Sequence, residues 1–162
     1  MLGITKFFKH LHTINVHRFL VCRNCFKMGL YWQGLVHDLS KYSPSEFWPG
    51  VKYFQGNRSP ISAEIQDIGY SDAWLHHKGH NRHHWQYWID QQGDHLVVLD
   101  PPLRYVKEMV ADRVAACMVY QKDKYHPSSA LEFMETGAET PLIPEKTKAT
   151  LKRYLTIVAE HD

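Results

Sequence analysis

The pattern of apolar and polar positions repeats at helical spacing over most of this chain. Between Thr13 and Met28 the apolar and weakly polar residues recur three or four positions apart, which places them on one face of a helix. That face comprises His17, Leu20, Val21, Asn24, Cys25 and Met28. Because His17 shares the face with apolar side chains, we expect it to point into the protein interior.

Two later segments show the same period. Pro102 suits the first turn of a helix that runs to about residue 121. Its apolar stripe comprises Val106, Val110, Val114 and Cys117. Asp112 lies on an adjoining face among apolar neighbours, so its carboxylate is expected to face inward. In a final helix over 145–162, the expected inner side comprises Leu151, Tyr154, Leu155 and Val158.

Helix-start signals divide the middle of the chain into short helices. Serine precedes proline at 43–44 and at 59–60, and Ser71 precedes Asp72, all typical of a helix N-terminus. Glu46 takes the capping-box position of the first of these helices. Gly79 is expected to end the third. Upstream, "YWQGLVHDLSKY" predicts a short buried helix that carries His37 and Asp38.

The secondary structure of the remaining segments is predicted from less regular patterns. Residues 81–92 are predicted to be helical, and "HLVVL" at 95–99 is interpreted as an extended loop or short edge piece, because a lone strand has no partner. Residues 124–144 are interpreted as a turn-rich connection with one brief helix. The pattern therefore predicts an all-α fold, a compact single-domain helical bundle over 1–162 without repeats or linkers.

Composition narrows the possible partners. The chain has 162 residues, enough for one domain, and its formal charge of +2 does not favour binding to a nucleic acid polymer or a membrane. No apolar run approaches the ~20 residues of a membrane span, and no signal-peptide core is seen, so we expect a cytoplasmic protein. Cys22, Cys25 and Cys117 are expected to be thiols, since "CRNC" has no second cysteine pair for a metal site.

Histidine is the residue type that points to chemistry. The chain has 12 histidines, and five of them fall in "HHKGHNRHH", from His76 to His84. Another, His37, stands directly before Asp38. Imidazole and carboxylate are the ligands that Fe, Mn and Zn accept, and packed helices can bring single ligands from distant segments together.

The inward histidines and aspartates also match a known signature. In the order H…HD…D, His17, His37, Asp38 and Asp112 resemble the HD superfamily of metal-dependent phosphohydrolases, over about residues 11–120. "HDLSK" resembles the HDxxK variant, in which the lysine, here Lys41, approaches a substrate phosphate. A second resemblance, carried by "GLVHDLSKYSPSEFWPGVKYFQG" and "WLHHKGHNRHHWQYW", is to a small bacterial family known only as a domain of unknown function.

The HD resemblance implies an all-α core with one or two divalent ions. In two-metal members Asp38 would bridge the ions. The first site would be completed by His17, His37 and Asp112. The second would take one histidine from each of two pairs, for which we choose His77 and His84, with His76 and His83 as second-line candidates. The spacing of His77 and His84 is tighter than in the family. The Gly-Tyr-Pro extension of members that cleave cyclic dinucleotides is missing, which disfavours that substrate.

The resemblance also implies a reaction. We expect a phosphohydrolase that uses a metal-activated hydroxide on a phosphomonoester, nucleotide or dinucleotide phosphate bond. Lys41 and Arg82 would bind the phosphate, and His80 would protonate the leaving oxygen. The cofactor would be one or two ions of Fe, Mn, Zn, Co or Mg. The partner would be a small phosphorylated molecule, with nucleotides among the candidates, and the sequence does not indicate an oligomeric state.

Other interpretations of the same residues stay open. The ligand set equally suits a di-iron oxygenase of the superfamily, and a non-catalytic, metal-stabilised binding protein would need it too. Lys41 is alternatively a solvated lysine, and part of the histidine cluster could have a surface role. The aromatic residues near the cluster could stack on a base or sugar, although core packing is favoured. They are Trp74, Trp85, Tyr87 and Trp88.

Overall fold

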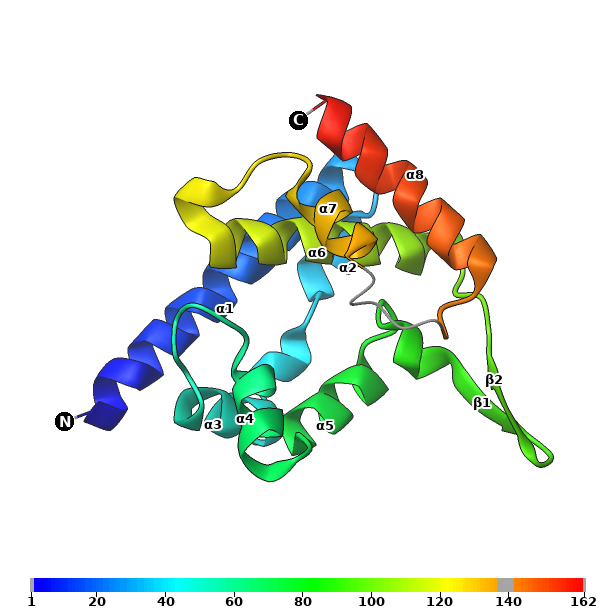
Figure 1. Ribbon diagram of the computed structural model, residues 1–162. Helices are drawn as coiled ribbons and strands as arrows, with labels where there is room; N and C mark the ends of the chain where they lie inside the picture. Colours follow the sequence, from blue (N-terminus) through cyan, green and yellow to red (C-terminus); the bar gives the residue numbers. More distant parts are fainter. Residues whose placement is uncertain (1, 137–141, 162) are drawn as a thin grey trace.

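Two long helices form the centre of the molecule. The computed structural model describes residues 2–136 and 142–161. Helix α1, Leu2–Lys27, packs against α6, Leu103–Gln121, through a buried cluster around Val21 and Ala115 (Figure 1). α1 begins earlier than the predicted start at Thr13, because the buried His10, one turn before Ile14, continues its inner face towards the N-terminus. The predicted stripe of α6 is confirmed, with Val106, Val110 and Val114 buried.

The C-terminal helices cover a second side of α6. After a 3-10 turn, η3 (Lys122–Lys124), come the short α7, Ser129–Glu135, and the final α8, Glu145–His161. Leu151 and Leu155 of α8 are fully buried against the α6 stripe, as the sequence predicted. The brief helix expected within 124–144 corresponds to α7, and part of that connection lies outside the described residues.

The segment between α1 and α6 folds into short helices. They are α2 (Tyr31–Val36), η1 (Leu39–Tyr42), α3 (Pro44–Lys52), α4 (Pro60–Ile68) and α5 (Asp72–His80). Of these, α2 packs on the C-terminal half of α1 and α3 on its N-terminal half. The predicted starts at Ser43, Ser59 and Ser71 are confirmed as N-caps. Only the Ser71 side chain accepts a capping hydrogen bond, from the Trp74 amide. α5 ends one residue beyond the predicted Gly79.

The predicted helix over 81–92 is wrong. A turn at 81–84 leads into the 3-10 helix η2, Trp85–Trp88, and then into β1, Ile89–Gln92. β1 pairs antiparallel with β2, His95–Val98, so the "HLVVL" segment does have a partner strand. Gly93, with φ +65°, begins the tight turn between Gln92 and His95. The described part of the chain is thus mostly helical, 73%, with one small hairpin.

The fold also bears on the expectations about membrane crossing and about the cysteines. Within residues 2–136 and 142–161, none of the helices combines the length and hydrophobicity that a membrane crossing requires. Cys22, Cys25 and Cys117 are free thiols, as predicted.

Candidate metal centre

His37 and Asp38 lie in a turn and not in the predicted helix. α2 ends at Val36, His37 caps it, and Asp38 has φ +51°, in the left-handed region, before η1 begins. Aspartate tolerates this conformation better than most residues. Arg18 of α1 holds the turn by donating to the carbonyls of His37, at 2.7 Å, and Leu35, at 3.0 Å. The turn carries both side chains into the interior, where they are 2% and 1% exposed.

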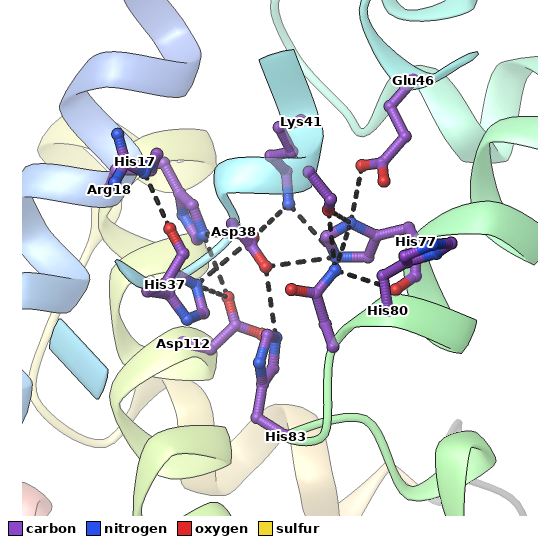
Figure 2. Close-up of polar contacts among 12 residues, drawn as sticks. His17, Arg18, His37, Asp38, Lys41, Glu46, His77, His80, His83 and Asp112 are labelled. Atoms are coloured by element: carbon purple, nitrogen blue, oxygen red, sulfur yellow. Dashed lines mark hydrogen bonds and ion pairs between the residues drawn. The ribbon is translucent and has the colours of Figure 1, made fainter. Parts of the chain in front are cut away.

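A first group of ligand-type side chains surrounds Oδ2 of Asp38. We call it site A; its members are His17, His37, Asp38 and Asp112, whose donor atoms lie within 4.8 Å of one another. Oδ2 lies 3.2 Å from Nε2 of His37 and 3.8 Å from Nε2 of His17. Asp112 of α6 faces the same two imidazoles, 3.0 Å from His17 and 3.6 Å from His37. Figure 2 shows these side chains converging from α1, the turn and α6.

A second group surrounds the other oxygen of the same carboxylate. Site B consists of Asp38, His77, His83 and His84, again within 4.8 Å. Oδ1 of Asp38 lies 3.4 Å from Nε2 of His77 and 3.5 Å from Nε2 of His83. The structure therefore brings the chosen pair, His77 and His84, together with Asp38, and adds His83, which was a second-line candidate. Asp38 is common to both sites, with one oxygen turned to each.

The turn after α5 explains why His83 and His84 both reach the interior. Asn81 caps α5 and donates to the carbonyl of His77 and to Ser40 Oγ, both at 2.8 Å. This anchors the end of α5 on η1 and breaks the helix before His83. The rings of His83 and His84 then pack 4.2 Å apart, and His84 packs 4.8 Å from His77. A continued helix would have turned the two neighbouring side chains about 100° apart.

Two glutamates that the sequence pattern did not assign to the site hold its histidines. Oε1 of Glu108 lies 3.0 Å from Nδ1 of His37 and 3.3 Å from Nδ1 of His83. Oε2 of Glu46 lies 2.7 Å from Nδ1 of His77. Glu46 was expected to complete a capping box; it turns to the histidines instead. Glu108 could have been found from its position one turn before Asp112, between Val106 and Val110.

These carboxylates fix the tautomers of the imidazoles. An ionised carboxylate only accepts hydrogen bonds, so Nδ1 of His77 and of His83 must donate. In a neutral imidazole Nε2 is then a bare lone pair, and both of these lone pairs face Oδ1 of Asp38. Burial and the Lys41 ammonium lower the pKa of His77, which keeps it neutral. Site B therefore brings three hydrogen-bond acceptors together: Nε2 of His77, Nε2 of His83 and Oδ1 of Asp38.

The charges of the site are closely coupled. Burial alone would raise the pKa of the Asp38 carboxyl, but His37, Lys41 and His77 bring it well below its usual value. Burial would lower the pKa of His37, yet Asp38, Asp112 and Glu108 raise it well above its usual value. Lys41 donates to Oδ2 of Asp38. The His37 proton and the Lys41 ammonium thus offset the carboxylate charge at site A.

Several buried polar atoms at the centre have no hydrogen-bond partner among the described residues. They are Nε2 of His37, Oδ1 of Asp38, Nε2 of His83 and Nε2 of His84. Buried polar atoms in proteins are nearly always hydrogen-bonded, because leaving one unpaired costs about 1–3 kcal/mol. These atoms converge on two neighbouring points, which is the geometry of a cation site.

Lys41, the expected phosphate ligand, lies at the edge of the centre. Its Nζ is 3.4 Å from Nε2 of His77 and contacts Asp38. It also lines a cavity of about 210 Å³ that reaches His17, His77 and Asp112. This position excludes a freely solvated lysine, because the ammonium is paired with Asp38 beside the cavity.

The other expected site residues lie outside both groups. Arg82 is exposed and donates to the hydroxyls of Tyr87 and Tyr105, each at 3.3 Å. His80 is exposed, stacks on His76 with ring centroids 4.0 Å apart and does not line the cavity. His76 pairs with Glu46 at 2.7 Å and is in neither group. The structure therefore offers no support for His80 as the acid or Arg82 as a phosphate clamp.

The four aromatic side chains near the cluster are half-buried, and Trp85 alone of them packs against a core cluster of the described residues. The ring of Trp74 stacks on His77, with centroids 5.9 Å apart, and meets His84 edge-on at 4.9 Å. Trp85 packs against the α6–α8 core. Trp88 donates from its indole to the carbonyl of Arg82, at 2.8 Å. Trp74 thus acts as an apolar wall behind site B.

Comparison with known proteins places the chain in a family. A search found neither a curated protein nor a solved structure that matches it. A family model does match, over residues 6–157, and this span contains every member of sites A and B together with Glu46, Glu108 and Lys41. The sequence had pointed to such a family as well as to the HD signature. The chain belongs to the Family of unknown function (DUF5662).

Proposed function

We propose that this chain is a metal-dependent phosphohydrolase of the HD type, with divalent ions at sites A and B bridged by Asp38. The observation that carries the proposal is the arrangement around Asp38, whose two oxygens face separate histidine sets. A single carboxylate between two groups of imidazoles, of which His37, His83 and His84 have an unpaired Nε2, suits a bridging ligand. No hydrogen bond from the described side chains reaches Oδ1, so a cation would satisfy it.

The donor sets fit particular metals. Site A offers two imidazoles and two carboxylates, and site B offers three imidazoles and one carboxylate. Imidazole-rich sites of this kind suit Fe, Mn, Zn or Co better than Mg, which prefers oxygen ligands. Glu108 and Glu46 supply the carboxylate support that metal-bound histidines usually have. Binding of a cation would displace the His37 proton, because a ligating imidazole must be neutral.

The cavity gives a phosphate access to the centre. It is lined by members of both sites, His17 and Asp112 from site A and His77 from site B, with Lys41 beside them. When bound, the ions would supply charge stabilisation and a water activated for attack near neutral pH. Lys41 would turn its ammonium from Asp38 towards the phosphoryl oxygens and offset their charge. Trp74, packed on His77 and His84, keeps water away from the back of site B.

The experiment has two arms. The chain is purified without chelator, its metals are measured, and it is then loaded with Mn, Fe, Co, Zn or Mg and incubated with phosphomonoesters, nucleotides and dinucleoside polyphosphates. Phosphate release that disappears in Asp38→Ala and persists in the exposed control Asp123→Ala supports the proposal. Oxygen uptake without phosphate release would favour the di-iron oxygenase. Full metal content with neither reaction would favour a metal-stabilised binding protein.

A further inference from the structure

The cavity beside the metal centre continues well beyond it. One end is formed by His17, Lys41, His77 and Asp112. Most of the remaining wall is apolar and comes from α1, α3, α4, α5 and α6; it includes Ile14, Pro49, Pro60, Ile61, Ala73 and Ala116. Its volume is about 210 Å³. For scale, a cavity of about 150 Å³ holds benzene, and drug-sized ligands occupy about 300 Å³ or more.

A buried carboxylate interrupts this apolar wall. Glu64 of α4 lines the cavity and is only 6% exposed. Its one described partner is the hydroxyl of Ser71, which donates to Oε2. Among the described residues, no lysine, arginine or histidine forms an ion pair with it. A buried carboxylate without a cationic partner is costly, so a cationic group of a ligand would stabilise Glu64 by pairing with it.

Most of the other charged groups of the cavity wall belong to the metal centre or already have partners. Lys41 and Asp112 belong to the metal end, and Glu46 is already paired with His76 and His77. His10 lies two turns before His17 on α1, about 10 Å along the helix. His10 is 7% exposed, and its Nδ1 has no hydrogen-bond partner in the described part of the chain. Burial lowers the pKa of His10 to about 4, so it brings no charge to the cavity wall.

Resting on the proposed function, we propose that the substrate is a compact aminoalkyl phosphate, with its phosphate at the metal end and Lys41, and its ammonium at Glu64. The apolar wall then covers a short alkyl chain. The volume of about 210 Å³ is below the range of drug-sized ligands, so a compact substrate is favoured over a nucleoside. Glu64 is the specificity-determining residue, and Ser71 holds its carboxylate in place.

The test compares matched ligands that the protein cannot hydrolyse. Binding of 3-aminopropylphosphonate and 3-hydroxypropylphosphonate to the metal-loaded chain is measured by calorimetry, with inorganic phosphate and the phosphonate analogue of adenosine monophosphate as references. We expect the amino ligand to bind at least about tenfold tighter than the hydroxy ligand. In Glu64→Gln, which keeps the acceptor for Ser71, this preference should disappear. In the control Asp67→Asn, on the same helix and outside the cavity wall, it should remain.

Each other outcome contradicts a stated claim. If inorganic phosphate binds but the amino and hydroxy ligands bind equally to the wild-type chain, the assignment of Glu64 is wrong and the proposed function stands. Tighter binding of the phosphonate analogue of adenosine monophosphate than of the amino ligand would overturn the compact substrate. If inorganic phosphate itself does not bind to the metal-loaded chain, the proposed function fails, and the substrate assignment fails with it.

Discussion

Oε1 of Glu108 lies 3.0 Å from Nδ1 of His37 and thereby connects the turn after α2 to the central helix α6. The same oxygen lies 3.3 Å from Nδ1 of His83, in the turn after α5. Glu108 thus links one histidine of site A to one of site B. Because the carboxylate accepts from both Nδ1 atoms, it directs both Nε2 atoms towards Asp38.

Removing the charge of Glu108 should weaken metal binding while the fold is kept. Glutamine keeps the shape of the side chain but accepts the imidazole hydrogen bonds less strongly. We expect Glu108→Gln to lower metal affinity about 10- to 100-fold, as loss of such support does in other metal sites. Competition with a chromophoric chelator measures this, with the exposed Glu132→Gln as control. Equal metal affinities in the two variants would show that Glu108 contributes only to packing.

Gly50 is required by the ring of His10. A Cβ at position 50 would lie 2.2 Å from Nε2 of His10, and that ring is buried against Phe47 and Phe54. Gly50→Ala should therefore destabilise the chain by about 1–3 kcal/mol. A Cβ at Gly79, on α5, would meet none of the described atoms within 4 Å, so Gly79→Ala should stabilise by about 0.5–1 kcal/mol. Denaturant unfolding of both variants compares them; equal effects would contradict the contact.

His10 should make stability fall at acidic pH. Burial and the Lys41 charge lower the pKa of His10 from 6.5 to about 4, so between these values the unfolded chain binds the extra proton. Stability due to the neutral ring is present above pH 6.5 and is lost as the pH falls towards 4. The loss should reach up to about 3 kcal/mol relative to His10→Gln. Unfolding of both chains between pH 7 and pH 4 tests this; parallel curves would contradict it.

Lys41 and Arg82 should differ sharply in their importance for phosphate release. Lys41 faces the cavity beside Asp38, whereas Arg82 binds two tyrosine hydroxyls on the surface. We expect Lys41→Met to reduce the turnover number at least about tenfold, because one charge on the phosphoryl oxygens is no longer offset. Arg82→Met should change it less than about twofold. A large loss in the Arg82 variant would restore the phosphate clamp expected from the sequence.

The sequence predicted the long helices well because their period depends on local pattern. The inward positions of His17, Leu151 and Leu155 follow from spacing alone, and all three are buried. The hairpin could not be predicted in this way. The residues of β1 are all exposed, so no alternation of apolar and polar positions distinguished the strand from a helix.

Details of the site depend on tertiary contacts that local patterns do not contain. The left-handed Asp38 is held by Arg18, from a helix 20 positions earlier, acting on the neighbouring carbonyls. The sequence around Glu46 is compatible both with capping of α3 and with binding of His77. Only the position of α5 in the fold decides between these two roles. The choice of His84 over His83 was equally open, because both follow the unpredicted turn at Asn81.

The metal content of two chains tests the central claim most directly. Elemental analysis of the wild-type chain, loaded with Mn or Zn and freed of excess metal, should give about two ions per chain, as expected for sites that share Asp38. The double variant His77→Ala/His83→Ala removes both nitrogens that face Oδ1 and should retain about one ion, held by His17, His37, Asp38 and Asp112. Equal metal content in the two chains, or its complete loss in the variant, would contradict two separate sites bridged by Asp38.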